Sequence, residues 1–274
     1  MSVEPLSAAA ASARAAAHAE RLAAYVEPHL ARRSRGEQHP VHDFLFGYYS
    51  QRPAQLLRWH PGFPGGDLTV EDVRARRPLL DATHRLLAAT ASRPAHTGCF
   101  GLHEWAMVYR ADETRHPQPL RLGGGGTDTV VESHRIACSH FDAFRFFTDD
   151  ARPRNTLRPG QDDRPEFEQP GCLHAGMDLY KHAFRLSPLI CSDLVADCFE
   201  LAWDIRVLDM RAAPYDLTGV RLDPTGEEWT PVRIETPEGK QEYAAAQASF
   251  AQRGAPLRAA LVAECARLRT VLDG

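Results

Sequence analysis

The sequence lacks any long apolar run, since no stretch approaches the roughly 18 to 20 apolar residues that a membrane-spanning helix needs. Its alanine-rich start, residues 1–26, has no basic segment leading into a leucine-rich core, so we interpret it as an amphipathic helix and not as an export signal. Six cysteines are scattered over 274 residues without a CxxC pair. This usage argues against a disulfide framework and predicts reduced thiols in a cytoplasmic protein.

The chain also lacks an excess of basic charge. Its 32 Lys and Arg residues face 36 Asp and Glu residues, which gives a formal net charge of −4 and a pI near 6.3. This balance disfavours a protein that lies along polyphosphate, where basic residues usually dominate one face. Nearly all of the basic residues are arginines, whose forked guanidinium suits carboxylates and phosphates. The charge therefore favours a small-molecule partner, although DNA stays open.

What the sequence does contain is helical spacing of apolar residues, without repeats, sustained heptads or a βαβ rhythm. We expect one mainly α domain over 1–274, a helical bundle with a long polar loop. The predicted helices cover 5–33 (within an N-terminal helical segment, 1–35), 40 to about 58, a segment opened by Pro78, 130–147, 171–186, 190–211 and 236 to about 272. The GGGG stretch at 123–126 predicts a hinge, and Thr129 with Glu132 predicts a capping box. Residues 148–169 are polar and predict a lid or a disordered loop.

Polar groups set among apolar residues are the candidates for chemistry. In GLHEWAMVYR, His103 and Glu104 have almost no polar company, so Glu104 is a candidate buried catalytic carboxylate, with an interior salt bridge as the alternative. In GCLHAGMDLYKHAF, His174 and Asp178 lie four residues apart and share a helix face. They could act as a base with its orienting carboxylate, or they could form a local ion pair.

The segment SDLVADCFELAWDIRVLDMR carries a further acidic stripe. Glu200 and Asp204 fall on it, and Arg211 follows. A solvated helix face is one interpretation of this spacing. Because apolar residues flank Asp204 closely, we expect it to join Glu104, Asp178 and His174 as a catalytic candidate.

Aromatic rings with polar edges predict the binding surface for a planar or cationic ligand. The predicted binding residues are Asp43, Tyr48, Tyr49, Arg52, Trp59, Trp105, Tyr180 and Arg211. The alternative is that these rings complete the core while Asp43 and Arg52 face water. The sequence alone leaves both interpretations open.

The metal signal is weak, because neither an HExxH motif nor the paired Glu-xx-His motif of di-iron bundles is present. No cofactor is predicted in the first instance. As an alternative, His103, His140, His174 and Glu200 could gather around a divalent ion such as iron or zinc.

Several strings resemble a known family. They are HPVHDFLFGYYSQRPAQLLRWHPG, GCFGLHEWAMVYR, ESHRIACSHFDAFRFFT, QPGCLHAGMDLYKHAFRLSP and ELAWDIRVLDMRAAPYD. They are similar to actinobacterial proteins labelled 3-methyladenine DNA glycosylase, and the resemblance covers most of the chain, about 39 to 255. The chain departs from helix-hairpin-helix glycosylases, because it lacks their Gly-rich hairpin followed by a catalytic Asp.

The resemblance implies hydrolysis of the N-glycosidic bond of a modified purine, as a base or nucleoside or within DNA. Such a reaction needs a carboxylate to stabilise an oxocarbenium-like sugar or to activate water, and rings to grip the base. The competing hypothesis is a metal- or cofactor-dependent enzyme for a small metabolite, with non-haem iron as one option. A third is a ligand-binding protein without catalysis. The oligomeric state is left open.

Overall fold

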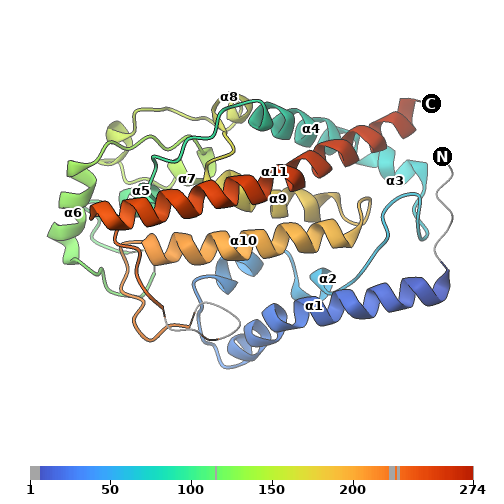
Figure 1. The fold of residues 1–274 in the computed structure, drawn as a ribbon, viewed down its shortest axis with the longest axis horizontal. Helices are drawn as coiled ribbons and strands as arrows, with labels where there is room; N and C mark the ends of the chain where they lie inside the picture. The colour runs from blue at the N-terminus through green and yellow to red at the C-terminus, as the bar shows by residue number, and fades with distance from the viewer. Residues whose placement is uncertain (1–6, 115, 222–225, 227–228, 274) are drawn as a thin grey trace.

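The computed structural model describes residues 7–114, 116–221, 226 and 229–273, and it shows a mainly helical protein (Figure 1). Its longer helices are α1 (Ala8–Ser34), α4 (Arg77–Ala91), α6 (Gly123–Ser133), α9 (Leu173–Leu186), α10 (Ser192–Ala212) and α11 (Pro237–Asp273). Shorter turns are η1 (Asp43–Tyr48, a π-helix), α2 (Pro53–Leu56), α3 (Val70–Ala75), α5 (Leu102–Ala106), α7 (Phe141–Phe144), η2 (Arg152–Arg154) and α8 (Arg164–Phe167). β pairing among the described residues is limited to two isolated bridges. The predicted mainly α fold is confirmed.

The centre of the fold is the hairpin of α9 and α10, the most extensively packed pair of helices. The two helices approach closely at Gly176, where a Cβ atom would lie 2.7 Å from Cδ1 of Ile205. In Figure 1, α11 runs along this pair on one side and α1 lies beyond α10 on the other. α4 packs on α11 in turn. One continuous apolar core results, and the residues of the candidate site project from its central helices.

The N-terminal helix forms as its sequence predicts. The Ser7 side chain accepts a hydrogen bond from the Ala10 N–H at 3.2 Å and caps α1. Leu22 and Val26 are buried on its inner face. The part of the predicted segment that falls on residues 1–6 lies outside the described residues. None of the described helices combines the length and apolar character needed to cross a bilayer.

The predicted helix from 40 to about 58 is wrong in its continuity. A π-helix from Asp43 to Tyr48 replaces its first half, and the chain then turns through Ser50, which has a φ of 58°. Because the residue before a proline disfavours the α region, Arg52 is extended ahead of Pro53. Only the short α2 follows. The consequence is that Phe44 and Tyr48 stack at the edge of a cavity instead of continuing a buried helix.

The predicted hinge at 123–126 is also wrong, since Gly123 begins α6. Thr129 lies inside that helix and donates to the Gly125 carbonyl at 2.8 Å, so it caps nothing. Glu132 instead accepts hydrogen bonds from Tyr109 and Arg110. The helix predicted over 130–147 ends at Ser133, and after a non-helical stretch α7 resumes at Phe141.

The polar segment 148–169 is packed and partly helical. Ala151 and Asn155 are buried, and the Asn155 side chain bonds to both the N–H and the carbonyl of Cys138. Its last part, α8 and the following Glu168, places charged side chains against α9. None of the described residues that line the cavity of the candidate site comes from this segment. A lid function stays a prediction.

Candidate active site

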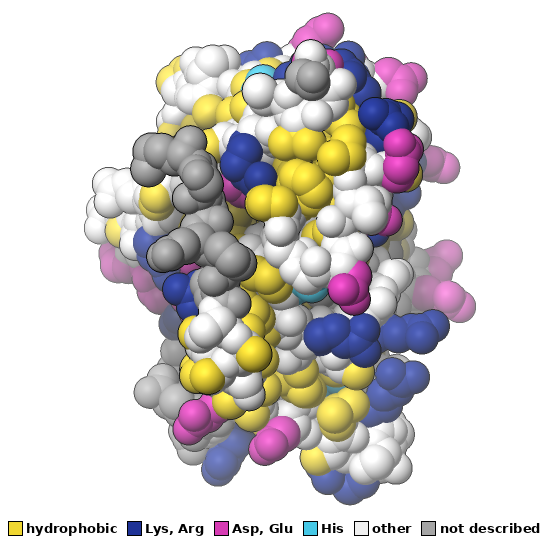
Figure 2. Space-filling model, turned by 90° about the vertical axis from the view of Figure 1, so that its right-hand side faces the viewer, with side chains coloured by type: hydrophobic (Ala, Val, Ile, Leu, Met, Phe, Trp, Pro, Cys, Tyr) yellow, Lys and Arg dark blue, Asp and Glu magenta, His cyan; other side chains and the backbone are white. Residues whose placement is uncertain are grey.

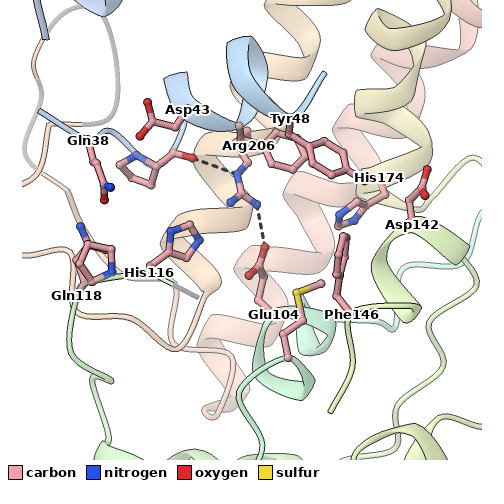
Figure 3. Close-up of a pocket in the computed structure, with 14 residues that line it drawn as sticks. Gln38, Asp43, Tyr48, Glu104, His116, Gln118, Asp142, Phe146, His174 and Arg206 are labelled. Carbon is pink, nitrogen blue, oxygen red and sulfur yellow. Dashed lines mark hydrogen bonds and ion pairs between the residues drawn. The ribbon is translucent and has the colours of Figure 1, made fainter. Parts of the chain in front are cut away.

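A cavity of about 310 Å³ opens beside the π-helix, between α5, α9 and α10. It is lined by Gln38, Pro40, Asp43, Phe44, Tyr48, Glu104, Met107, His116, Pro117, Gln118, Asp142, Phe146, His174 and Arg206. Figure 3 shows Glu104 and Arg206 pointing toward one another, with His174, Asp142 and Phe146 on one side and Gln38, His116 and Gln118 on the other. The lining therefore gathers residues from segments that are far apart in the sequence.

Glu104 is held in place by Arg206. The Arg206 guanidinium donates to the Glu104 carboxylate at 2.8 Å and to the Asp209 carboxylate at 2.6 Å, and all three side chains are buried. It also lies 4.3 Å from the centre of the Phe44 ring. A charged pair of this kind, hydrogen-bonded at both ends, fixes the orientation of Glu104 at the cavity wall. The interior salt bridge offered for Glu104 is confirmed, and its catalytic role stays a prediction for a carboxylate that also lines the cavity.

Three aromatic rings form the apolar part of the wall. Phe44 and Tyr48 are stacked with their centroids 5.0 Å apart, and Phe146 meets Tyr48 edge-on at 6.4 Å. Tyr48 remains 38% exposed, so its ring is accessible from solvent. The Arg145 guanidinium donates to the Tyr48 hydroxyl at 3.0 Å and steadies the ring. This geometry suits a planar ligand lying against the rings.

A histidine group lies at the inner end of the cavity. His103 from α5, His174 from α9 and Asp209 from α10 are buried, and one potential ligand atom of each lies within 4.8 Å of the others. Burial, helped by nearby His103, lowers the pKa of His174 well below its usual value. For His103, burial opposes the charge but Asp209 outweighs it, so that pKa is raised. Burial would likewise raise the pKa of Asp209, yet His103 and Arg206 hold it well below normal.

A second buried charged group, centred on Asp178, lies next to the histidine group. Its carboxylates already bind cationic side chains. Asp178 accepts from Arg164 at 2.8 Å, from Lys181 at 3.3 Å and from the Tyr49 hydroxyl at 3.0 Å. His140 lies 3.4 Å from Asp178 and equally far from Glu168. Burial would raise the pKa of Asp178, but His140 and Lys181 hold it well below its usual value. Asp178 therefore stays ionised beneath the cavity and does not line it.

Several predicted site residues are not brought to the cavity. Asp204 is exposed and pairs with Arg253, and Glu200 pairs with Arg21 at the surface. Arg211 binds Thr230 and Glu242 on the outside of α10. The solvated-face interpretation of the acidic stripe is thus the one that the structure supports, because the apolar neighbours of Asp204 point the other way around the helix.

Four predicted binding residues have structural roles elsewhere. Trp105 is fully buried and donates to the Ala212 carbonyl, and Tyr180 packs in the core against Tyr49 and Phe199. Trp59 donates to Asp193, and Arg52 is exposed ahead of α2. Of the rings selected from the sequence, only Tyr48 lines the cavity, and Asp43 lines it as well. Aromatic character alone did not separate core rings from cavity rings.

The sequence interpretation missed Arg206, Asp209, Asp142, Phe44 and Phe146. A signal for the first two was present in DIRVLDMR, where Arg206 and Asp209 are three residues apart between Ile205, Leu208 and Met210. Charged residues at that spacing on an apolar helix face indicate an interior pair. The two phenylalanines gave no signal, because nothing in a phenylalanine distinguishes a cavity wall from a core.

No protein-family model, curated protein or solved structure matches the chain. Its function has to be inferred from the residues that line and underlie the cavity.

Proposed function

We propose that the chain is an enzyme that hydrolyses the N-glycosidic bond of a small purine nucleoside carrying a positively charged, alkylated base. The observation behind this proposal is the lining of the 310 Å³ cavity. Three aromatic rings stand together with three carboxylates, Asp43, Glu104 and Asp142, while Arg206 is the one guanidinium in the described lining. Aromatic faces and carboxylates attract planar cations, and a purine alkylated on a ring nitrogen is one.

The size of the cavity supports a small substrate. A volume of about 310 Å³ lies at the lower end of the roughly 300 to 1,000 Å³ that small-molecule sites occupy. The lining combines apolar rings with a few convergent polar groups, which is the composition such sites need for affinity and orientation. A nucleoside fits this description better than a larger conjugate.

The reaction needs an ionised carboxylate as general base and does not need a general acid. Water forms the new bond to the anomeric carbon, the bond from that carbon to the base nitrogen breaks, and its electron pair leaves with the base. For an alkylated purine this electron pair neutralises the ring, so the leaving base needs no added proton. The proton that water loses goes to a general base, and the sugar carries positive charge in the transition state.

We assign these tasks to Glu104. Its carboxylate lines the cavity, takes the proton of the attacking water and stabilises the charge on the sugar, while Arg206 holds it in position. His174, which burial keeps neutral, lies alongside and orients the water. Asp178 acts only as a positioning residue, through its contacts with His140 and Tyr49.

A free nucleoside suits the charge of the molecule better than duplex DNA does. On the face drawn in Figure 2, Lys and Arg side chains are mixed with Asp and Glu and do not form a uniform basic surface. The formal net charge is −4. All six cysteines are free, which favours a reducing compartment such as the cytoplasm. A damaged base within DNA is the alternative substrate, and it would add a repair role.

A metal-dependent enzyme for a small metabolite is the second candidate. One observation favours it, namely the two imidazoles and one carboxylate at the inner end of the cavity. Glu200, one of the ligands expected from the sequence, plays no part in that group, because it binds Arg21 at the surface.

The test is base release from 7-methylguanosine, followed by chromatography, with methylated duplex DNA as a parallel substrate. We expect the wild type to release 7-methylguanine and Glu104→Gln to do so at least about 100-fold more slowly, the usual size of a general-base effect. Asp204→Asn, an exposed acid on the same molecule, should leave the rate unchanged. No release from nucleoside or DNA by the folded wild type would refute the proposal.

A further inference from the structure

Three side chains from three different helices converge at a buried point between α5, α9 and α10. His103 is 5% exposed, His174 6% and Asp209 fully buried. One nitrogen or oxygen atom of each lies within 4.8 Å of the others. The imidazole rings of His103 and His174 meet edge to face, with centroids 4.6 Å apart and planes at 83°. They are therefore not stacked on one another.

The closest contact in this group joins His103 to Asp209. Nε2 of His103 lies 3.0 Å from Oδ1 of Asp209, and neither atom has another polar partner among the described residues. Both atoms are buried and face one another, so a cation that binds both would also satisfy both. Two atoms bound at about 2.1 Å to one tetrahedral metal ion lie about 3.4 Å apart. The observed 3.0 Å is the distance of a direct ion pair, and a small outward shift of either side chain would admit a shared cation.

The other oxygen of Asp209 is already occupied. Arg206 donates to Oδ2 at 2.6 Å and leaves Oδ1 facing His103. Metal-binding carboxylates are commonly held in this way by a hydrogen-bond donor behind them. Arg206 thus fits the role of an outer partner that orients Asp209.

The neighbouring acidic group makes a useful contrast. His140, Glu168 and Asp178 also come together, but the guanidinium of Arg164 and the ammonium of Lys181 supply cations to them. At His103, His174 and Asp209, the described residues bring one guanidinium and no ammonium into contact, and this guanidinium, of Arg206, lies on the far oxygen of Asp209. The first group is surrounded by guanidinium and ammonium groups, whereas the inner oxygen of Asp209 in the second group faces an imidazole, which is a common metal ligand.

The location also gives access. His174 lines the 310 Å³ cavity and, together with His103, a second cavity of about 440 Å³. A cation at the convergence point would face open space, so that coordination positions stay available to water or substrate.

We propose that His103, His174 and Asp209 bind one divalent transition-metal ion at the inner end of the cavity. Two imidazoles and one carboxylate suit zinc, iron(II) or manganese(II) and suit calcium and magnesium poorly, because these prefer oxygen ligands. The site replaces the set expected from the sequence, since Asp209 takes the place of His140 and Glu200. It holds for either candidate reaction and does not depend on which bond is cleaved.

The test is metal binding by the full chain, measured without reference to activity. The purified protein is stripped with a chelator and titrated with Zn²⁺, with anaerobic Fe²⁺ and with Co²⁺, whose visible spectrum reports its ligands, and Mg²⁺ serves as the comparison ion. Two matched pairs of variants lie on the same helices: His174→Ala with His182→Ala on α9, and Asp209→Asn with Asp204→Asn on α10. Thermal unfolding establishes that each variant is folded.

We expect one ion per chain, a Co²⁺ spectrum without thiolate charge-transfer bands, and no comparable binding of Mg²⁺. His174→Ala and Asp209→Asn should weaken binding more than about 100-fold, beyond the usual cost of losing an outer partner. His182→Ala and Asp204→Asn should bind as the wild type does. Absence of stoichiometric binding in the wild type overturns the proposal, and so does binding that survives Asp209→Asn or shows cysteine ligation. Neither result affects the base-release test.

Discussion

Arg206 on α10 and Glu104 on α5 form a buried ion pair at 2.8 Å, across 102 positions of sequence. Glu104 lines the cavity from the short helix α5, which begins at Leu102 directly after Gly101, whose φ of 70° favours glycine. Arg206 reaches it from the central helix hairpin and binds Asp209 with the same guanidinium nitrogen. The pair therefore links the cavity wall to the histidine group beneath it.

Removing the arginine of this pair should unfold the protein more easily. Arg206→Gln leaves two buried carboxylates without their cation, and breaking a buried pair in this way costs about 3 to 5 kcal/mol. Arg253→Gln removes the exposed partner of Asp204 and should cost no more than about 1 kcal/mol. Urea unfolding of both variants measures the difference. Equal losses would show that the Glu104 pair is not the buried link described here.

The ring of Tyr48 should contribute to ligand affinity more than its hydroxyl does. Tyr48→Ala removes a face on which the purine stacks, which typically costs about 1 to 3 kcal/mol per base. Tyr48→Phe keeps the ring and loses only the contact with Arg145, so its affinity should stay close to that of the wild type. Calorimetric titration with 7-methylguanosine compares the two. Equal losses in both variants would assign the effect to the hydroxyl.

Acid should destabilise the fold partly through His182. Burial, with Arg164, Lys181 and Arg185 adding to it and Asp178 opposing it, lowers the pKa of His182 to about 3, and neither ring nitrogen has a hydrogen-bond partner among the described residues. The unfolded chain takes up a proton near pH 6.5 and the folded chain does so only near 3. The stability from neutral His182 is therefore complete above about pH 6.5 and is lost as the pH falls toward 3.

The variant His182→Leu isolates this contribution. Its free energy of unfolding should fall less steeply than that of the wild type between pH 6.5 and 4, by up to about 1.4 kcal/mol per pH unit. Urea unfolding at a series of pH values measures the slopes. The stability of the variant should still fall with falling pH, because burial also lowers the pKa of His39 to about 4. Identical slopes would mean that His182 takes up its proton at the same pH in the folded and the unfolded chain.

The glycine run at 123–126 provides a test of the corrected helix boundary. A Cβ atom at Gly125 meets no other atom within 4 Å, so Gly125→Ala should stabilise α6 by about 0.5 to 1 kcal/mol. At Gly239 a Cβ atom would overlap the Arg233 carbonyl, and Gly239→Ala should destabilise the protein by about 1 to 3 kcal/mol. Thermal unfolding measures both shifts. A destabilised Gly125→Ala would support the hinge that the sequence predicts.

The helical fold was predictable because apolar spacing repeats over long stretches. The helices at 171–186 and 190–211 lie within two residues of α9 and α10, since strong periodicity and clear breaks at Ser187 and Pro188 leave few alternatives. The segment at 40–58 failed because a π-helix uses the same residue types as an α-helix, and only the Ser50 backbone reveals the break. Apolar spacing alone could not distinguish the π-helix and the turn at Ser50 from a continuous α-helix.

The candidate site was predictable only where a polar residue stands alone among apolar ones. Glu104, His103 and His174 met that condition, and all three are buried at the cavity or directly beneath it. Asp204 has apolar neighbours in the sequence, but on the folded helix its side chain faces solvent and Arg253. Which of the aromatic rings line a cavity depends on packing between distant segments, and a single sequence carries no record of it.

The crystal structure of Glu104→Gln soaked with 7-methylguanosine would examine the proposed reaction most directly. We predict that the purine lies against Tyr48 and Phe146, with its anomeric carbon facing residue 104 and the bond intact. A ligand seated instead in the second cavity, beside Cys99 and Cys138, or the absence of any bound ligand at millimolar concentration, would contradict the account.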